Sequence, residues 1–283
     1  LLVSLEQGRR LAGEASKSHP YFREMGGPLA ATPEFFRDIA AKRYFQNRLT
    51  YIAARYGAYR SVLSWDLLES VDECWAILKQ SPEDATLTPN EADLCRRARR
   101  DVQTWAEEAA LHLRGMDQHE HLIGVSTSLN PDKAWTDLEQ QPNLDWTISR
   151  QPSSGAAEIG FIDPAAQFCS WSAAARQPGR AHRPWLVAGI SATPVIEKNF
   201  GNTAGDRTRA AAVLERNLLY AALNCGMAGA PIEFGVNDGP ALRGAVQFAY
   251  ALSRIAQREG KDELRALVLE TKTPEGSALR VLG

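Results

Sequence analysis

The sequence predicts an α/β fold of the (β/α)8 TIM-barrel type, in which parallel strands alternate with helices. Apolar strand-like runs alternate with long helical patterns along most of the 283 residues. The second apolar run, residues 62–68, leads directly into a group of carboxylates. Because barrels keep their active sites at the carboxyl ends of the strands, we expect the chemistry of this chain at such a strand end.

The first β/α unit can be followed residue by residue. Leu1–Leu5 is an apolar run that predicts a strand, followed by a long Gly- and Pro-rich loop. Apolar residues then recur at helical spacing and predict a helix over 33–56. Thr32 is the expected N-cap, with Pro33 in the first turn, and Gly57 is expected to end the helix.

The same rhythm continues to about residue 258. Further strands are predicted at 62–68, 122–129, 145–149, 184–190 and 231–236. Further helices are predicted at 89–112, 133–139, 164–175, 206–223 and 240–258, with a short helix around 74–78. We therefore expect six strands, each followed by a helix, where a closed barrel needs eight.

The C-terminal residues do not continue this rhythm. Residues 266–270, a Thr-Pro-Glu-Gly turn and residues 278–282 predict a β-hairpin. The hairpin is expected to be either an edge ribbon or the first part of a β-sandwich. We accordingly expect a barrel domain over 1–260 and a separate β element over 261–283.

Composition excludes several partners. The formal net charge of -2 provides no basic stripe for nucleic acid. No apolar run approaches the roughly 18 residues that a membrane span needs, and no signal peptide is visible.

The chain opens on an apolar run without Met, so we expect that upstream sequence has been processed away or left out, and compartment cannot be read from this end.

Cysteine and histidine spacing predicts neither a cofactor nor a metal centre. The four cysteines include no CxxC pair. A disulfide between Cys74 and Cys95 is one alternative, and free buried thiols are the favoured one. The only close histidine pair is His119 and His121, which at this spacing point the same way only on a strand.

One segment resembles a known family. The residues ARYG at 54–57 and VLSWDLLESVD at 62–72 resemble the fourth-strand region of cellulase-like glycoside hydrolases of clan A. The HPY at 19–21 and GGP at 26–28 agree with the resemblance. It implies a (β/α)8 barrel, of which this chain holds the third to eighth strands, and an extracellular or cell-envelope location.

The resemblance also implies where the catalytic pair would lie. In that family a glutamate at the end of the fourth strand is the acid/base, and one at the end of the seventh is the nucleophile. The corresponding positions here are Ser70 and Gly189. A serine hydroxyl cannot protonate a leaving group unaided, and glycine has no side chain to attack carbon. The usual two-carboxylate mechanism is therefore expected to be lost.

Replacements for the lost pair can be named. Glu69 is adjacent to Ser70, and a β-bulge would be needed to turn it into the mouth; Glu233 lies near the expected tip of the eighth strand. The alternative is that both are solvated or ion-paired loop carboxylates. The expected sugar-binding residues are Trp135, Trp146 and Arg150, whereas Trp65 is expected in the core.

Three functions remain open at this point. The first is a catalytically degenerate barrel that binds carbohydrate or acts as an assembly module. The second is an active glycosidase that uses Glu69 and Glu233. The third is a purely structural subunit whose loops bind other protein chains. Fold alone does not decide among them.

Overall fold

The structure is a computed structural model that describes residues 2–59, 62–128, 135, 138, 140–150, 185–188, 268–272 and 278–282. The chain divides into two compact units. Unit 1 comprises Leu1–Arg150 with Pro178–Pro184, and unit 2 comprises Gln151–Gln177 with Trp185–Gly283.

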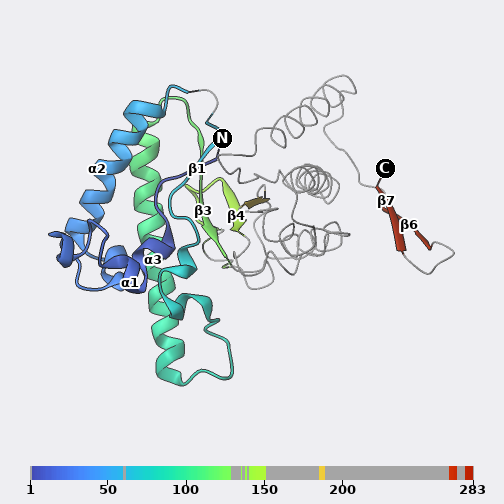
Figure 1. Ribbon diagram of the computed structural model, residues 1–283, viewed down its shortest axis with the longest axis horizontal. Coiled ribbons are helices and arrows are strands. Elements are labelled where there is room, and N and C mark those ends of the chain that lie inside the picture. The colour runs from blue at the N-terminus through green and yellow to red at the C-terminus, as the bar shows by residue number, and fades with distance from the viewer. Residues whose placement is uncertain are drawn as a thin grey trace, which may run out of the picture. The chain divides into compact units, whose positions relative to one another are not determined.

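The sheet of unit 1 is parallel, as the sequence predicts. Its strands follow chain order, β1 (Leu2–Ser4), β2 (Ser64–Asp66), β3 (Leu122–Thr127) and β4 (Trp146–Arg150) (Figure 1). Each neighbouring pair is parallel. The predicted strands at these four places are confirmed, although the first three are shorter than expected.

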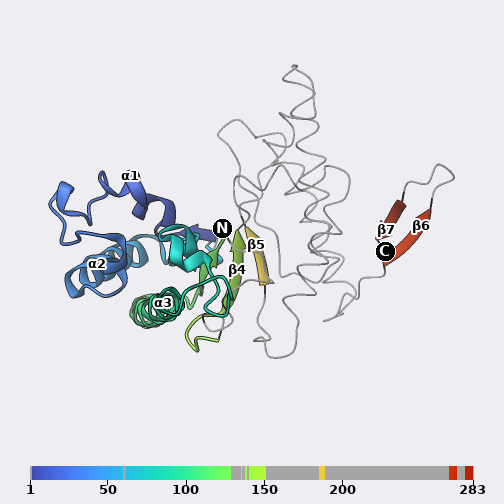
Figure 2. The ribbon, with the colours of Figure 1, turned by 90° about the horizontal axis from the view of Figure 1, so that it is seen from below.

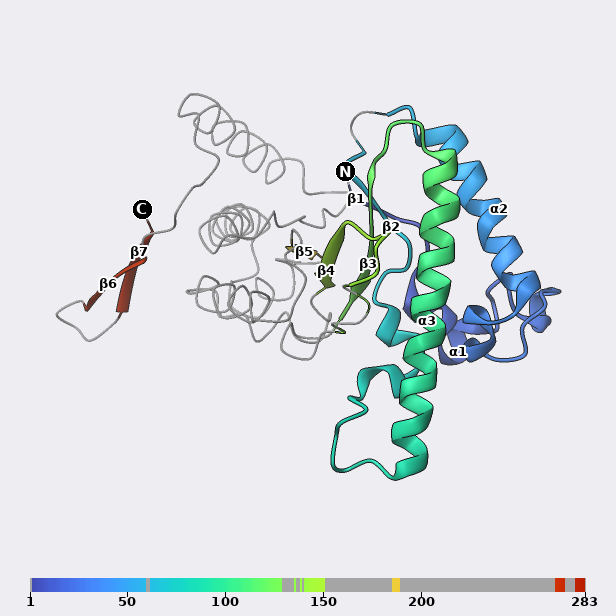
Figure 3. The same cartoon turned by 180° about the vertical axis from the view of Figure 1, so that it is seen from behind.

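Two long helices cover one face of this sheet. α2 (Ile39–Tyr56) and α3 (Pro89–Met116) lie side by side on the same side of the strands in all three views (Figures 1, 2 and 3). The short α1 (Gly13–Ser16) belongs to the connection between β1 and α2. Parallel strands joined through helices on one face are the repeating unit of a (β/α) barrel.

The two faces of the sheet differ in chemistry. Trp65 and Ile123 are register partners that belong to the hydrophobic core with Val125. The alternate residues Ser64 and Asp66 point to the opposite face, because side chains alternate along a strand. Both are fully buried. This second face is therefore polar and also covered, so its polar groups need hydrogen-bond partners.

Helix α2 begins later than the sequence predicts. Residues Thr32–Phe36 form a separate 3-10 helix, η3, and the chain turns at Arg37. Asp38 is the true N-cap of α2, with its Oδ1 accepting from the Ala41 N–H at 2.8 Å. The expected cap, Thr32, instead donates its hydroxyl to the Leu11 carbonyl at 2.5 Å. Gly57 does follow the last helical residue, as expected.

Helix α3 begins where the sequence predicts. Thr88 and Glu91 form a reciprocal capping box in front of Pro89. The helix continues to Met116, about one turn beyond the predicted end at residue 112. Its buried side includes Cys95 and Trp105, as expected for a helix that packs on a sheet.

Aromatic rings fill the space between these helices and η3. The Trp105 ring centroid lies 5.1 Å from that of Phe45 and 5.4 Å from that of Phe35. Phe36 meets the same indole edge-on at 5.5 Å. Such clusters contribute both buried apolar area and favourable ring geometry. The expectation that Trp65 belongs to the core is confirmed, because its side chain is fully buried.

The connections after β1 and β2 contain short 3-10 helices. The first holds η1 (Gly8–Leu11) and η2 (Arg23–Met25), and the second holds η4 (Val71–Glu73) and η5 (Ala76–Lys79). η5 takes the place of the short helix predicted around 74–78. Cys74 and Cys95 are buried free thiols, so the disulfide alternative is wrong and the favoured reading is confirmed for this pair.

Unit 2 is described at three strands. β5 (Trp185–Ala188) falls within the predicted strand at 184–190. β6 (Val268–Lys272) and β7 (Ala278–Leu282) pair antiparallel. The predicted helices at 164–175, 206–223 and 240–258 and the strand at 231–236 lie outside the described residues, as does the helix predicted at 133–139 except for residues 135 and 138. The boundary at residue 260 and a β-sandwich beyond the hairpin stay predictions.

Candidate functional site

The candidate site is the carboxyl end of β1, β2 and β3, where acidic and hydroxyl side chains gather. Asp66, the last residue of β2, is fully buried. Its Oδ2 accepts from the Ser126 hydroxyl at 2.7 Å, and its Oδ1 accepts from the Ser126 N–H at 3.1 Å. One carboxylate thus holds the ends of two strands together.

Asp72 repeats this arrangement further along the loop. It is fully buried, and its Oδ1 accepts from the Ser128 N–H at 2.6 Å. The Ser128 hydroxyl donates to the other carboxylate oxygen. Asp66 at the end of β2 and Asp72 in the loop after it therefore both bind the end of β3. Each accepts from a buried backbone N–H, which would be costly to leave without an acceptor.

Ser70 occupies the position that the family resemblance assigns to the acid/base. It has φ 52° and ψ 60°, in the left-handed region, and only 6% of its surface is exposed. Its N–H donates to the Ser126 hydroxyl at 3.1 Å, and its carbonyl accepts from the Glu73 N–H at 2.9 Å. The residue turns the chain from the strand end into η4.

Glu69 lies beside it in a different environment. Its N–H donates to the Glu6 carbonyl at 2.8 Å, and its carbonyl accepts from the Gly8 N–H at 2.7 Å. Its backbone is therefore joined to the end of β1, while the residue as a whole is partly exposed. β2 ends at Asp66, and Glu69 forms an isolated parallel bridge with Gln7.

Glu73 adds a third carboxylate next to Glu69 and Asp72. Burial raises the pKa of Glu73, and the charges of Asp72 and Glu69 act in the same direction. Arg9, whose Nε lies 3.5 Å from the Glu73 carboxylate, and Lys79 oppose this rise in pKa. The carboxylates after β2 are thus close enough to repel one another.

A buried carboxylate at the end of β1 was not predicted. Glu6 is 2% exposed, and its Oε2 lies 3.3 Å from Nε2 of the buried His19. Arg48, from α2, donates to the same oxygen. His19 Nδ1 accepts from the Tyr21 N–H at 3.4 Å, which leaves the proton on Nε2 facing Glu6.

The electrostatics of Glu6 follow from these contacts. Burial alone would raise the pKa of Glu6, because it disfavours the charged form. The hydrogen bond from His19, the charge of Arg48 and the N–H of Gln7 outweigh burial and lower the pKa. The HPY motif is visible in the sequence, but its residues carry no signal that identifies Glu6 as the partner of His19.

The expected sugar-binding residues are found away from solvent. Trp135 is 1% exposed, with the Arg99 guanidinium 4.9 Å from its ring centroid. Trp146 is 5% exposed, and its Nε1 donates to the Ser64 hydroxyl at 2.9 Å. Stacking on either indole would need neighbouring groups to move. Arg150 ends β4, and its side chain lies outside the described structure, as do Gly189 and Glu233.

Within the described residues, no group of three or more His, Cys, Asp and Glu side chains is placed to hold a metal ion. His121 Nδ1 instead pairs with Asp117 Oδ2 at 2.8 Å, and the Trp65 indole donates to the same oxygen at 2.9 Å. This cluster ties the loop after α3 to the helix-facing side of β2. Among the helices described, none is long and apolar enough to cross a membrane.

Comparison with known proteins gives a structural match only. Neither the family models nor the curated proteins yield a match. The solved endo-1,4-beta-mannanase from Rhizomucor miehei is similar with a TM-score of 0.52 at 10% identity, covering 90% of this chain and 72% of the mannanase. A variant of a Glycoside Hydrolase Family 5 mannosidase from Rhizomucor miehei gives a TM-score of 0.47 at 11% identity, covering 90% and 70%.

The likeness to the mannanase bears on the fold. The chain has an α/β fold with a parallel sheet, and the likeness to the mannanase at 10% identity extends to the fold alone. The predicted α/β fold class is confirmed at that level. The substitution of both catalytic positions, the candidate replacements and the sugar-binding residues stay predictions.

Proposed function

We propose that this protein is a catalytically degenerate glycoside-hydrolase-like domain that binds carbohydrate or serves as an assembly module. The observation that carries the proposal is Ser70. It stands at the expected acid/base position with a left-handed backbone, it is buried, and its N–H donates a hydrogen bond to Ser126 at the end of β3. Ser70 thus lies in a buried turn of the backbone, and a serine hydroxyl is too weak an acid to protonate a glycosidic oxygen.

The neighbouring carboxylates support the same proposal. Asp66 and Asp72 are fully buried and hydrogen-bonded to Ser126 and Ser128. An acid/base must reach its substrate, which neither carboxylate does without breaking these bonds. The end of β2 and the loop after it therefore use Asp66 and Asp72 to hold the fold, whereas Glu69 and Glu73 are partly exposed.

The test is a hydrolysis assay with the full chain on β-1,4-linked mannan, glucan and xylan. We expect no release of reducing ends above that of a mock preparation carried through the same columns. Hydrolysis that follows the protein through every column would contradict the proposal.

The second candidate function is an active glycosidase that uses Glu69 and Glu233. It is favoured by the partial exposure of Glu69 at the strand end and by its nearness to Glu73. In that case Glu69→Gln and Glu233→Gln would each abolish hydrolysis, and Glu14→Gln, on the exposed α1, would not.

A purely structural role is the third candidate. It predicts no sugar binding and co-purification with stoichiometric protein partners.

A further inference from the structure

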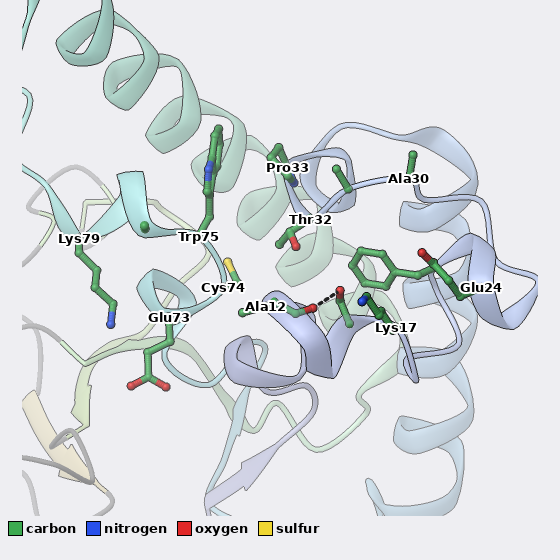
Figure 4. A pocket seen from close by; sticks show the side chains of 15 residues that line it. Ala12, Lys17, Glu24, Ala30, Thr32, Pro33, Glu73, Cys74, Trp75 and Lys79 are labelled. Carbon is green, nitrogen blue, oxygen red and sulfur yellow. Dashed lines mark hydrogen bonds between the residues drawn. The ribbon is translucent and has the colours of Figure 1, made fainter.

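A pocket of about 660 Å3 lies in unit 1 between the connections that follow β1 and β2 (Figure 4). Its lining comes from the α1 region, the η2 region, the start of η3 and the segment from η4 to η5. Glu69 and Ser70 are not among the residues that line it. The pocket is thus separate from the catalytic positions considered above, and its volume is in the range of small-molecule sites.

Two rings form an apolar wall of this pocket. Trp75 is partly buried, with one part packed against the hydrophobic core and the rest lining the pocket. Pro33, in the first turn of η3, lines it as well, and both rings stand at the upper rim in Figure 4. Small side chains such as Ala12, Ala31 and Ala76 line the pocket around them, leaving room for a flat ligand against the indole.

Charged side chains of both signs complete the lining. Lys79 and Glu73 stand at the lower left in Figure 4, and Lys17 and Glu24 stand at the right. With two cations and two anions, the pocket favours neither a strongly anionic nor a strongly cationic ligand. It offers ammonium donors and carboxylate acceptors together, which is what a ligand with many hydroxyl groups needs.

The pocket holds no activated nucleophile. Cys74 is the one thiol in its lining, and it is buried with its Sγ donating to the Val71 carbonyl at 2.8 Å. Burial, with a further contribution from the charge of Asp72, raises the pKa of the Cys74 thiol far above neutral, so the thiolate is not populated. The arrangement is suited to binding and not to covalent chemistry.

We propose that this pocket binds a neutral oligosaccharide, with one sugar ring stacked on Trp75 and hydroxyl groups shared among the lysines and glutamates. A sugar ring combines an apolar C–H face with a rim of hydroxyl donors and acceptors, which matches an indole wall flanked by both kinds of charge. The inference rests on the carbohydrate-binding role proposed above, and it places that role at Trp75 and outside the strand-end site.

The test is calorimetric titration of the full chain with neutral β-1,4-linked hexasaccharides of mannose, glucose and xylose. We expect at least one to bind, and Trp75→Ala to weaken its affinity at least tenfold, since buried tryptophan contacts dominate binding sites. Trp75→Phe should restore most of the affinity. Ala76→Phe should weaken binding by filling the pocket without removing the indole.

The matched control is Tyr51→Ala, which removes an aromatic ring that is 61% exposed on α2, away from the pocket lining. Its affinity should equal that of the unmodified protein. Circular dichroism of each variant confirms that it is folded.

Two results would overturn the inference, and they differ in what they say of the proposed function. Sugar binding that is unchanged in both Trp75→Ala and Ala76→Phe would place the carbohydrate site elsewhere and leave the binding role intact. No binding of any neutral hexasaccharide up to about 10 mM, beyond the weak end of specific affinity, would remove carbohydrate binding and leave only the assembly role. Binding of a peptide in this pocket in place of sugar would likewise remove carbohydrate binding and leave only the assembly role.

Discussion

Glu6 carries its charge in a place that water hardly reaches. Its carboxylate is stabilised by His19 and Arg48, which reach it from different segments of the chain. The sequence does not pair the HPY motif with Glu6, because the contact depends on how the loop after β1 folds back over the strand end. The same is true of Asp66 and Ser126, which meet only because β2 and β3 are adjacent.

The pH dependence of stability should report on Glu6. Its pKa in the folded protein is lowered from the ordinary value of 4.5. A lowered folded pKa stabilises the protein above pH 4.5, and that stabilisation is lost as the pH falls through the folded pKa. Glu6→Gln should therefore lower the free energy of unfolding at pH 7 by about 3 kcal/mol, the low end for a broken buried pair, because Arg48 is partly solvated.

The measurement is urea-induced unfolding from pH 7 down to pH 3. The gap in unfolding free energy between Glu6→Gln and the unmodified protein should narrow below pH 4.5, where the carboxyl of the unfolded chain begins to be protonated, and it should close as the pH falls through the lowered pKa of the folded protein. Glu14→Gln is the control, since its exposed pair with Lys17 contributes at most about 0.5 kcal/mol. A gap that stays constant across this range would contradict the account given for Glu6.

Gly8 provides a second test at the scale of single residues. A Cβ at this position would lie 2.2 Å from the Ser70 carbonyl oxygen, and backbone cannot move aside cheaply. Gly8→Ala should therefore destabilise the protein by about 2 kcal/mol through overpacking of the β1 and β2 ends. In Gly115→Ala the new methyl group meets no atom within 4 Å, and unfolding free energy should rise by up to about 1 kcal/mol. Equal effects of the two substitutions would show that the strand ends are loosely packed.

At the scale of elements, capping residues in the sequence predict the start of a helix correctly where no tertiary contact competes with them. The start of α3 could be predicted because Thr88, Pro89 and Glu91 form a capping box within a few residues. The start of α2 could not be predicted, because Thr32 and Pro33 carry equally good signals. What decides there is the burial of Phe35 and Phe36 against Trp105, which holds the first turn as a separate 3-10 helix.

Removing the cap of α2 distinguishes the two possible starts. Asp38→Ala should lower the free energy of unfolding by about 1 kcal/mol, since the Ala41 N–H loses its acceptor. Asp38→Asn should change it little, because asparagine caps comparably. Chemical denaturation of the three proteins measures both effects. If Asp38→Ala were neutral, the helix would begin at Thr32 as the sequence alone suggests.

At the scale of the whole molecule, alternating strands and helices were enough to predict a parallel α/β fold, which the likeness to the mannanase confirms. The expectation of one barrel domain over 1–260 stays a prediction, beside a chain that divides into two compact units. The candidate site was located through the β2 segment, while Gly189 and Glu233 remain predictions about residues outside the described structure.

The two views of domain organisation make different predictions for a fragment. The hydrophobic cluster of the described residues runs from Leu5 to Leu144, so residues 1–150 contain it entire. A fragment of that length buries enough surface to fold on its own if its core is complete. We expect residues 1–150 to unfold cooperatively in urea, with coincident transitions by circular dichroism and tryptophan fluorescence. A fragment that binds hydrophobic dyes and melts without cooperativity would instead favour the single barrel, because a barrel is complete only with all of its strands.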